Sequence, residues 1–197
     1  MSFEVNVQLK GRFVFFATNN VNKFNEARQI LGHSRVAVGM LRIKSLEIQS
    51  ESLEEIAKTS VLEAFQKYKL PIVVEDAGLF VEALNGFPGP YAAYVYRTIG
   101  NEGILRLMKD IDNRKATFKS AVAYFSSDLT SPICFEGTAK GKITLEEKKP
   151  AEKEGFGFDP IFKPDHTSKA FAQMNIVEKC KHSHRAAAFR KFAKWYK

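Results

Sequence analysis

The chain has 197 residues, of which 45% are hydrophobic, and it carries a formal net charge of +8 at pH 7. This composition excludes a disordered chain, and the length suits one domain, or one core with two lobes, better than two independent domains. The positive charge indicates an anionic partner, for which nucleotides, nucleic acids and acidic membranes are all candidates.

The first half of the chain alternates short apolar runs with amphipathic ones. The predicted elements are a buried strand at 12–17, a helix at 20–31 that stops at Gly32, a strand at 36–43, a helix at 53–70 capped by Ser52, and a strand that begins at Pro71. This last strand, PIVVED, is expected to end in its two acids.

The second half begins with the turn-rich segment NGFPGPYAAY. The elements expected after it are helical sequence at 91–108, two β runs at 116–126 and 133–145 joined as a hairpin, a loop EGFGFDPIF that leads into a short strand, and a basic helix at 177–196 interrupted near His182. This order predicts an α/β fold with a mixed sheet flanked by helices. We expect a single domain over residues 1–197, with 1–11 as a leader.

Cysteine usage and hydropathy bear on the location of the protein. Cys134 and Cys180 form no CxxC pair, which favours a reducing cytosol. The stretch MSFEVNVQLKGR has the features of neither a signal peptide nor a transit peptide, and no segment approaches the roughly 20 apolar residues that span a bilayer. We therefore expect a cytoplasmic protein without a membrane segment.

The junction ATNNVNKF joins the first strand to the first helix. A helix N-terminus offers free N–H groups and a positive dipole end to an anion, and Lys23 adds a charge one turn into the helix. The segment lacks the glycines of a P-loop or a dinucleotide fingerprint. A phosphate site and a plain helix cap both remain open here.

The segment VVEDAG brings Glu75 and Asp76 to the end of an apolar strand. Because neighbouring strand residues point to opposite faces, one acid should face a cleft and the other should meet solvent or a lysine. The acid in the cleft suits Mg²⁺ binding or proton acceptance, and Glu47 could converge on the same ion. A strand end rich in solvated acids is the alternative.

The segment EGFGFDP holds aromatic residues between glycines. Phe156 could stack on a base while Asp159 reads the edge of that base, or Phe156 and Phe158 could pack into the core of an ordinary turn. Gly155 and Gly157 permit the unusual backbone angles that either arrangement needs.

The segment EKCKHSHRAAAFRK concentrates positive charge around Ser183, which could cap the last helix. Phosphate binding, base recognition, a nucleic-acid patch and a solvated basic helix are all open for this run. His182 and His184 are two residues apart, which places them on different helix faces and makes a zinc site improbable.

Together, TNNVNK, EIQ, VVEDAGLFVEALNGFPGPY, GFGFDPIF and EKCKHSHR resemble the inosine triphosphate pyrophosphatase family, from about Phe13 to the C-terminal helix. The resemblance implies an elongated mixed sheet in two lobes with a central active-site cleft. It also implies a Mg²⁺-dependent homodimer that hydrolyses ITP, dITP and XTP to the nucleoside monophosphate and pyrophosphate.

The same resemblance implies the roles of individual residues. Asp76 would be the catalytic proton acceptor, and Glu47 and Asp76 would hold the metal. The substrate-binding residues would be Thr18, Asn19, Asn20, Val21, Asn22, Lys23, Ala77, Phe156, Gly157, Phe158, Asp159, Lys179, His184 and Arg185. Phe156 would lie against the base, with His184 and Arg185 near its 6-oxo edge.

Some positions depart from the family pattern. Ala77 stands where a hydroxyl residue is common, Lys58 is out of register with a usual helix lysine, and His182 replaces an apolar residue. Two other functions compete with this one: a nucleic-acid-binding domain, and a related pyrophosphatase for other bases such as modified pyrimidines. We expect no stable nucleic-acid complex.

Overall fold

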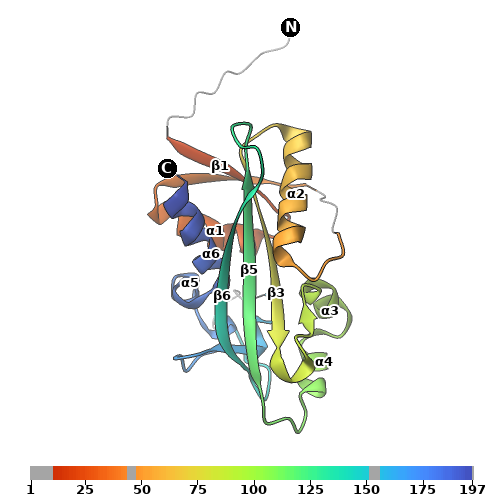
Figure 1. The fold of residues 1–197 in the computed structure, drawn as a ribbon. Coiled ribbons are helices and arrows are strands. Elements are labelled where there is room, and N and C mark those ends of the chain that lie inside the picture. Colours follow the sequence, from red (N-terminus) through yellow and green to blue (C-terminus); the bar gives the residue numbers. More distant parts are fainter. Residues whose placement is uncertain (1–10, 44–47, 151–155, 197) are drawn as a thin grey trace.

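The structure is a computed structural model that describes residues 11–43, 48–150 and 156–196. Within these residues it has one sheet of seven strands, in the order β2-β1-β3-β5-β6-β7 with β4 beside β3 (Figure 1). β1 pairs in parallel with β2 and β3, and the remaining pairs are antiparallel. The predicted α/β fold with a mixed sheet flanked by helices is confirmed.

The elements have the following bounds. The strands are β1 Arg12–Ala17, β2 Val36–Leu41, β3 Ile72–Val81, β4 Pro88–Gly89, β5 Lys115–Phe125, β6 Ile133–Ile143 and β7 Phe162–Pro164. The α-helices are α1 Val21–His33, α2 Leu53–Tyr68, α3 Ala92–Thr98, α4 Gly100–Leu107, α5 Ile176–His182 and α6 His184–Trp195, and the 3-10 helices are η1 Glu82–Leu84, η2 Asp159–Ile161 and η3 Phe171–Gln173.

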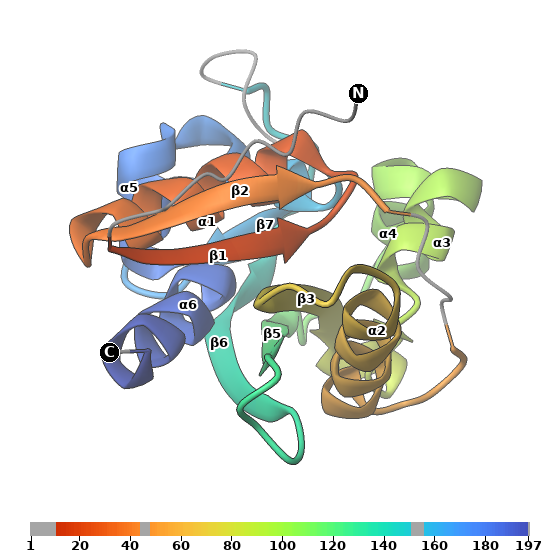
Figure 2. The same ribbon diagram turned by 90° about the horizontal axis from the view of Figure 1, so that it is seen from above.

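Helices cover both faces of the sheet (Figures 1 and 2). α1 and α6 share one buried cluster with β1, while α2 packs on the opposite face against β3 and β5. A third cluster fills the other half of the long strands, where α3, α4 and η2 pack. The molecule is therefore elongated along β3, β5 and β6. Among the described residues, no helix combines the length and the apolar character needed to cross a membrane.

Three predicted helix ends differ from the structure. α1 continues through Gly32 to His33, because Gly32 keeps helical geometry and the left-handed residue that follows the helix is Arg35, with φ of 56°. α2 ends at Tyr68 rather than residue 70, because Lys69 is left-handed. The helical sequence expected at 91–108 forms two helices separated at Ile99, and the second begins at Gly100, which has φ of 62°.

The expectation that the third strand ends at its two acids is wrong, because β3 runs on to Val81. Residues 77–81 keep an apolar character and pair with β5 without interruption, from Ala77 with Ser120 to Val81 with Ala116. β1, on the other side, pairs with β3 only at the beginning of that strand. The acids therefore lie just beyond the parallel pairing, where β3 loses β1 as its neighbour.

The C-terminal basic segment forms two helices broken at Ser183, close to the predicted interruption. The Ser183 hydroxyl accepts a hydrogen bond from the Ala186 N–H, so the predicted cap of the last helix is confirmed. Tyr196 Oη donates to Phe13 O at 2.8 Å, which ties the end of this segment to β1. The start of α6 is held beside α1 and β3 by Arg185, which pairs with Glu26 and Glu75.

Candidate functional site

Two cavities meet beside the two acids of β3. The first, the aromatic pocket, has a volume of about 310 Å³ and is lined by residues of α1, β3, α3, the 156–159 segment and α6. The second, the strand pocket, has a volume of about 360 Å³ and lies between β3, α2 and α3. Both are lined by Asp76, Pro90, Ala93 and Arg97, which we call the junction.

The aromatic pocket gathers most of the residues singled out in the sequence. Those that line it are Asn20, Lys23, Asp76, Ala77, Phe156, Gly157, Phe158, Asp159, His184 and Arg185. Asn22 and Lys179 line a smaller neighbouring cavity of about 110 Å³. Thr18, Asn19 and Val21 are outside the linings of both cavities.

The start of α1 is a helix cap. The Asn20 side chain accepts from the backbone N–H groups of Asn22 and Lys23, at 3.0 and 3.1 Å. The Thr18 hydroxyl accepts from the Asn20 N–H, and the Asn19 amide donates to Ile43 O at 2.6 Å. The cap holds the loop in a fixed shape and sends Lys23 toward β3.

Glu75 and Asp76 take different environments, as the alternation of a strand predicts. Glu75 is buried and accepts from Ser120 Oγ at 2.8 Å, with Lys23 Nζ at 2.9 Å and Arg185 Nε at 3.1 Å from its carboxylate. Burial alone would raise the pKa of Glu75, but Arg185 and Lys23 hold it well below its usual range. Asp76 lines both pockets at the junction.

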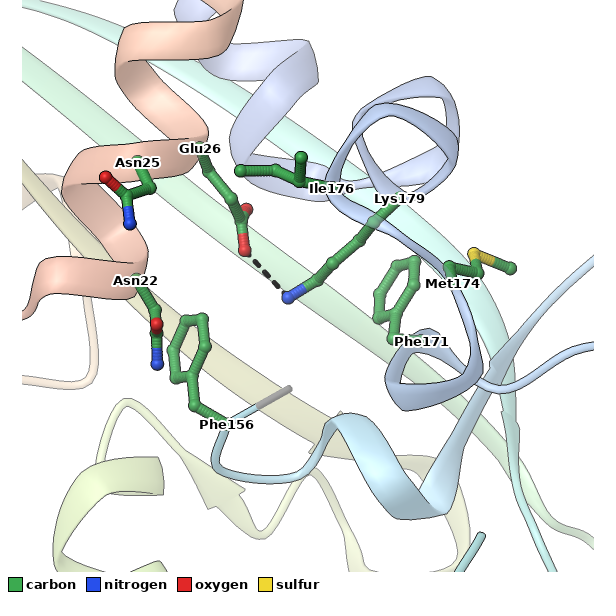
Figure 3. Close-up of a pocket in the computed structure, with 8 residues that line it drawn as sticks. All are labelled: Asn22, Asn25, Glu26, Phe156, Phe171, Met174, Ile176 and Lys179. Carbon is green, nitrogen blue, oxygen red and sulfur yellow. Dashed lines mark hydrogen bonds and ion pairs between the residues drawn. The ribbon is translucent and has the colours of Figure 1, made fainter. Parts of the chain in front are cut away.

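A second buried ion-pair cluster centres on Glu26 of α1. Its carboxylate lies 2.7 Å from Lys179 Nζ and 2.8 Å from Arg185 Nη1, and Figure 3 shows Lys179 reaching from α5 to this carboxylate. Burial opposes ionisation, yet Arg185 and Lys179 lower the pKa of Glu26 to about 2. Asp159 Oδ2 lies 2.6 Å from Lys179 Nζ, so the pairs continue from α1 through α5 to the 156–159 segment.

Phe156 and Phe158 have separate roles. The Phe156 ring lies 4.7 Å from Lys179 Nζ and 5.4 Å from the Arg185 guanidinium carbon, and it lines the aromatic pocket. Phe158 is buried in the core and meets the Tyr96 ring edge to face. The Phe156 N–H donates to Asp159 Oδ2 at 3.0 Å, which fixes the segment as a turn. Of the two alternatives for this segment, Phe156 therefore follows the pocket, whereas Phe158 packs into the core and also lines the pocket wall.

His184 is a buried, neutral imidazole at the wall of the aromatic pocket. Its ring stacks on Phe118 with centroids 4.6 Å apart and planes 7° apart. Burial and then the Arg185 cation lower the pKa of His184 to about 3. Within the part of the chain that the structure describes, neither ring nitrogen has a hydrogen-bond partner. A buried imidazole of this kind can give one N–H donor and one acceptor to a ligand.

Of the two predicted metal ligands, Glu47 and Asp76, the structure describes only Asp76. Glu47 lies outside the described residues. Among residues 11–43, 48–150 and 156–196 there is no group of three or more His, Cys, Asp or Glu placed to hold a metal. Asp76 supplies a carboxylate at the junction, the donor type that Mg²⁺ prefers. Lys58, the lysine noted as out of register, pairs with Glu54 on its own helix.

Sequence reasoning missed three residues of this site: Glu26, Ser120 and Arg97. Glu26 carried a signal, because it falls beside Ala27 and in line with Ile30 on the apolar stripe of α1, where a carboxylate needs a buried partner. Ser120 lies beside Glu75 because of the register in which β3 pairs with β5, and that register could not be read from either segment alone. Arg97 lies in α3, and the sequence did not predict which side of this helix faces the sheet.

The fold and the site define an α/β protein whose partly aromatic pocket shares an acidic strand residue, Asp76, with a second pocket. The Ham1 family model matches residues 14–195, and the chain belongs to this family. The resemblance identified in the sequence is thereby confirmed.

Relatives and solved structures agree with this membership. The chain is 48% identical to a dITP/XTP pyrophosphatase of Methanopyrus kandleri, over 93% of this chain and 96% of that one. It is 46% identical to a dITP/XTP pyrophosphatase of Thermococcus kodakarensis, over 92% and 96% of the two chains. The Staphylococcus aureus Ham1 protein has a similar structure, with a TM-score of 0.77 and 26% identity over 93% of this chain and 97% of that chain.

Proposed function

We propose that this chain is a nucleoside triphosphate pyrophosphatase that hydrolyses ITP, dITP and XTP to the nucleoside monophosphate and pyrophosphate, and so removes these nucleotides from the pool. The observation that carries the proposal is the position of Asp76 in the lining of two pockets that share four residues, one of the pockets being suited to a base. The relatives, whose sequences match nearly the whole chain, are named dITP/XTP pyrophosphatases, and these names support the substrate class.

The aromatic pocket would hold the purine. Phe156 offers a ring face for stacking, which is worth roughly 1–3 kcal/mol per base. His184 and Arg185 offer N–H donors to a 6-oxo group. An amino group at that position would leave such donors unpaired, so ATP is expected to bind less well than ITP.

Asp76 would accept the proton of the attacking water. Glu75 is unsuited to this role, because Lys23, Arg185 and Ser120 already engage its buried carboxylate. Asp76 lines both pockets, whereas Glu75 lines only the strand pocket. Proton transfer to a placed carboxylate contributes roughly 100- to 10,000-fold to a rate.

Mg²⁺ is the expected cofactor, held by Asp76 and Glu47 with phosphate oxygens of the substrate. The carboxylate of Asp76 at the junction fits such an ion, and a bound Mg²⁺ would neutralise charge on the phosphates. Thr18, Asn19, Asn20, Val21, Asn22 and Lys23 remain the predicted contacts of the phosphate chain.

We further propose a homodimer. The described surface exposes several large apolar side chains on neighbouring helices, among them Tyr94 and Ile99 around α3 and Leu107 on α4. Exposed apolar side chains of this kind favour association. Light scattering coupled to gel filtration would give a mass near twice 22.2 kDa.

The cytoplasmic location and the absence of a stable nucleic-acid complex remain predictions.

A panel of nucleoside triphosphates tests the proposed activity. The protein is incubated with Mg²⁺ and each of ITP, dITP, XTP, ATP, GTP, CTP and UTP, and pyrophosphate and orthophosphate are measured separately. We expect pyrophosphate from the deaminated purines and little product from the standard nucleotides. Release of orthophosphate, or an equal rate with ATP, would contradict the proposal. Preference for a pyrimidine would point to the related pyrophosphatases for other bases.

A further inference from the structure

The buried ion pairs of the site are electrically balanced. Three carboxylates, Glu26, Glu75 and Asp159, face three cations. These cations are Lys23, Lys179 and Arg185, so three negative and three positive charges sum to zero. The three carboxylates, Lys179 and Arg185 are buried and Lys23 is partly exposed, so an uncompensated charge among the buried members would be costly. The cluster therefore orients its members but offers little net attraction to a polyanion.

Arg97 differs from the other cations that line the two pockets. Lys23 lies 2.9 Å from Glu75, and Arg185 is held by Glu26 and Glu75. Within the described ranges, Arg97 forms no ion pair or hydrogen bond through its side chain, and it is exposed in the last turn of α3. Its guanidinium is therefore available to a ligand.

The position of Arg97 relates it to the chemistry. Of the four junction residues, Asp76 and Arg97 are the charged ones. Asp76 belongs to β3 and Arg97 to α3. A ligand that extends from the aromatic pocket into the strand pocket would lie beside these shared residues. A guanidinium binds phosphate through paired N–H donors and keeps its charge at all relevant pH values.

We propose that Arg97 binds the departing pyrophosphate, that is, the β and γ phosphates of the substrate. This inference rests on the proposed pyrophosphatase activity. Attack at phosphorus places the entering and leaving oxygens roughly in line, so a water at Asp76 directs the leaving group away from β3. Arg97 on the α3 wall neutralises the charge that develops on that group.

The test compares Arg97→Gln and Arg97→Lys with a matched control, Arg106→Gln. Arg106 also lies in the last turn of a helix, α4, but pairs with Glu102 and lines neither pocket. We expect Arg97→Gln to raise the KM for ITP and to weaken pyrophosphate binding, measured by calorimetry with Mg²⁺, by roughly 10- to 100-fold, as for loss of a hydrogen-bonded charge. IMP binding and the melting temperature should not change. Arg97→Lys should recover part of the pyrophosphate affinity, and Arg106→Gln should match the wild type.

The outcomes separate this inference from the proposed function. Unchanged pyrophosphate binding in Arg97→Gln would overturn the role of Arg97, and so would an equal loss of IMP binding, which would place the side chain on the α phosphate. If the wild type released no pyrophosphate from any deaminated purine nucleotide, the proposed activity would fail. The calorimetric comparison would still decide whether Arg97 binds pyrophosphate.

Discussion

At the scale of single residues, Glu75 and Asp76 show how one peptide step separates two carboxylates. Glu75 is buried among Lys23, Arg185 and Ser120, and its charge is used to hold those side chains. Asp76, the next residue of the strand, lines both pockets, whereas Glu75 lines only the strand pocket. In the proposed mechanism Glu75 therefore shapes the site, and Asp76 acts on the substrate.

Replacing Asp76 by Asn tests this division. Asn keeps the shape of the side chain but cannot accept the proton, so turnover of ITP should fall by roughly 100-fold or more while the protein stays folded. Initial rates of pyrophosphate release measure the effect. Asp112→Asn, at an exposed position, serves as the control and should keep the wild-type rate. A wild-type rate in Asp76→Asn would remove Asp76 from the mechanism.

His184 makes folding sensitive to mild acid. Its pKa is about 3 in the folded protein, against 6.5 in the unfolded chain, so below pH 6.5 the unfolded state binds a proton that the folded state refuses. Stability is therefore lost as the pH falls from 6.5 toward 3. The groups that face the imidazole are Arg185, Glu75, Glu26 and Lys179.

Urea unfolding at pH 7 and pH 5 measures this effect. The wild type should lose roughly 2 kcal/mol more than His184→Gln over that interval. Glu26 has a folded pKa of about 2 against 4.5 in the unfolded chain, so the stability that it contributes is lost mainly below pH 4.5. It therefore does not affect the comparison between pH 7 and pH 5. Equal slopes for wild type and His184→Gln would show that the imidazole is not held neutral.

At the scale of elements, the contact between β6 and α6 sets the position of His184 and Arg185, the two residues proposed to recognise the base. Gly137 of β6 lies directly under the first turn of α6, and a Cβ there would come 2.1 Å from His184 O and 2.5 Å from Ala188 N. Only glycine permits this approach. The start of α6, which carries His184 and Arg185, is thus set against the sheet by the absence of a side chain on β6.

Gly137→Ala should therefore damage both stability and activity. The added methyl must move α6, at a cost of roughly 1–3 kcal/mol, and ITP turnover should fall because His184 and Arg185 move with the helix. Gly32→Ala is the matched control, since nothing lies within 4 Å of its added Cβ. As a helical position it should gain roughly 0.5–1 kcal/mol. Urea unfolding and initial rates report both effects, and an unchanged midpoint in Gly137→Ala would show that α6 does not depend on this contact.

At the scale of the whole molecule, local patterns predicted most elements but not how far they extend or what they pair with. The cap at Asn20 and the break at Ser183 were visible, because both depend on residues within one turn. The continuation of β3 was not, because it depends on pairing with β5, a distant segment. The same holds for the Glu26 cluster, whose partners lie more than 150 residues away.

The site itself forms where distant parts of the chain meet. α1 contributes Lys23 and Glu26, β3 the two acids, α3 the cation Arg97, and α6 the residues His184 and Arg185. The hydrogen bond from Tyr196 to Phe13 closes this arrangement by tying the end of the chain to β1. Family resemblance named most of these residues, and only the assembled fold shows that the buried charges cancel and leave Arg97 available.

The position of bond cleavage tests the central claim most directly. ITP is hydrolysed by the protein with Mg²⁺ in water enriched in ¹⁸O, and the products are analysed by mass spectrometry. Attack by a water at Asp76 on the α phosphorus predicts one ¹⁸O atom in IMP and none in pyrophosphate. Label in pyrophosphate, or release of labelled orthophosphate, would contradict the account.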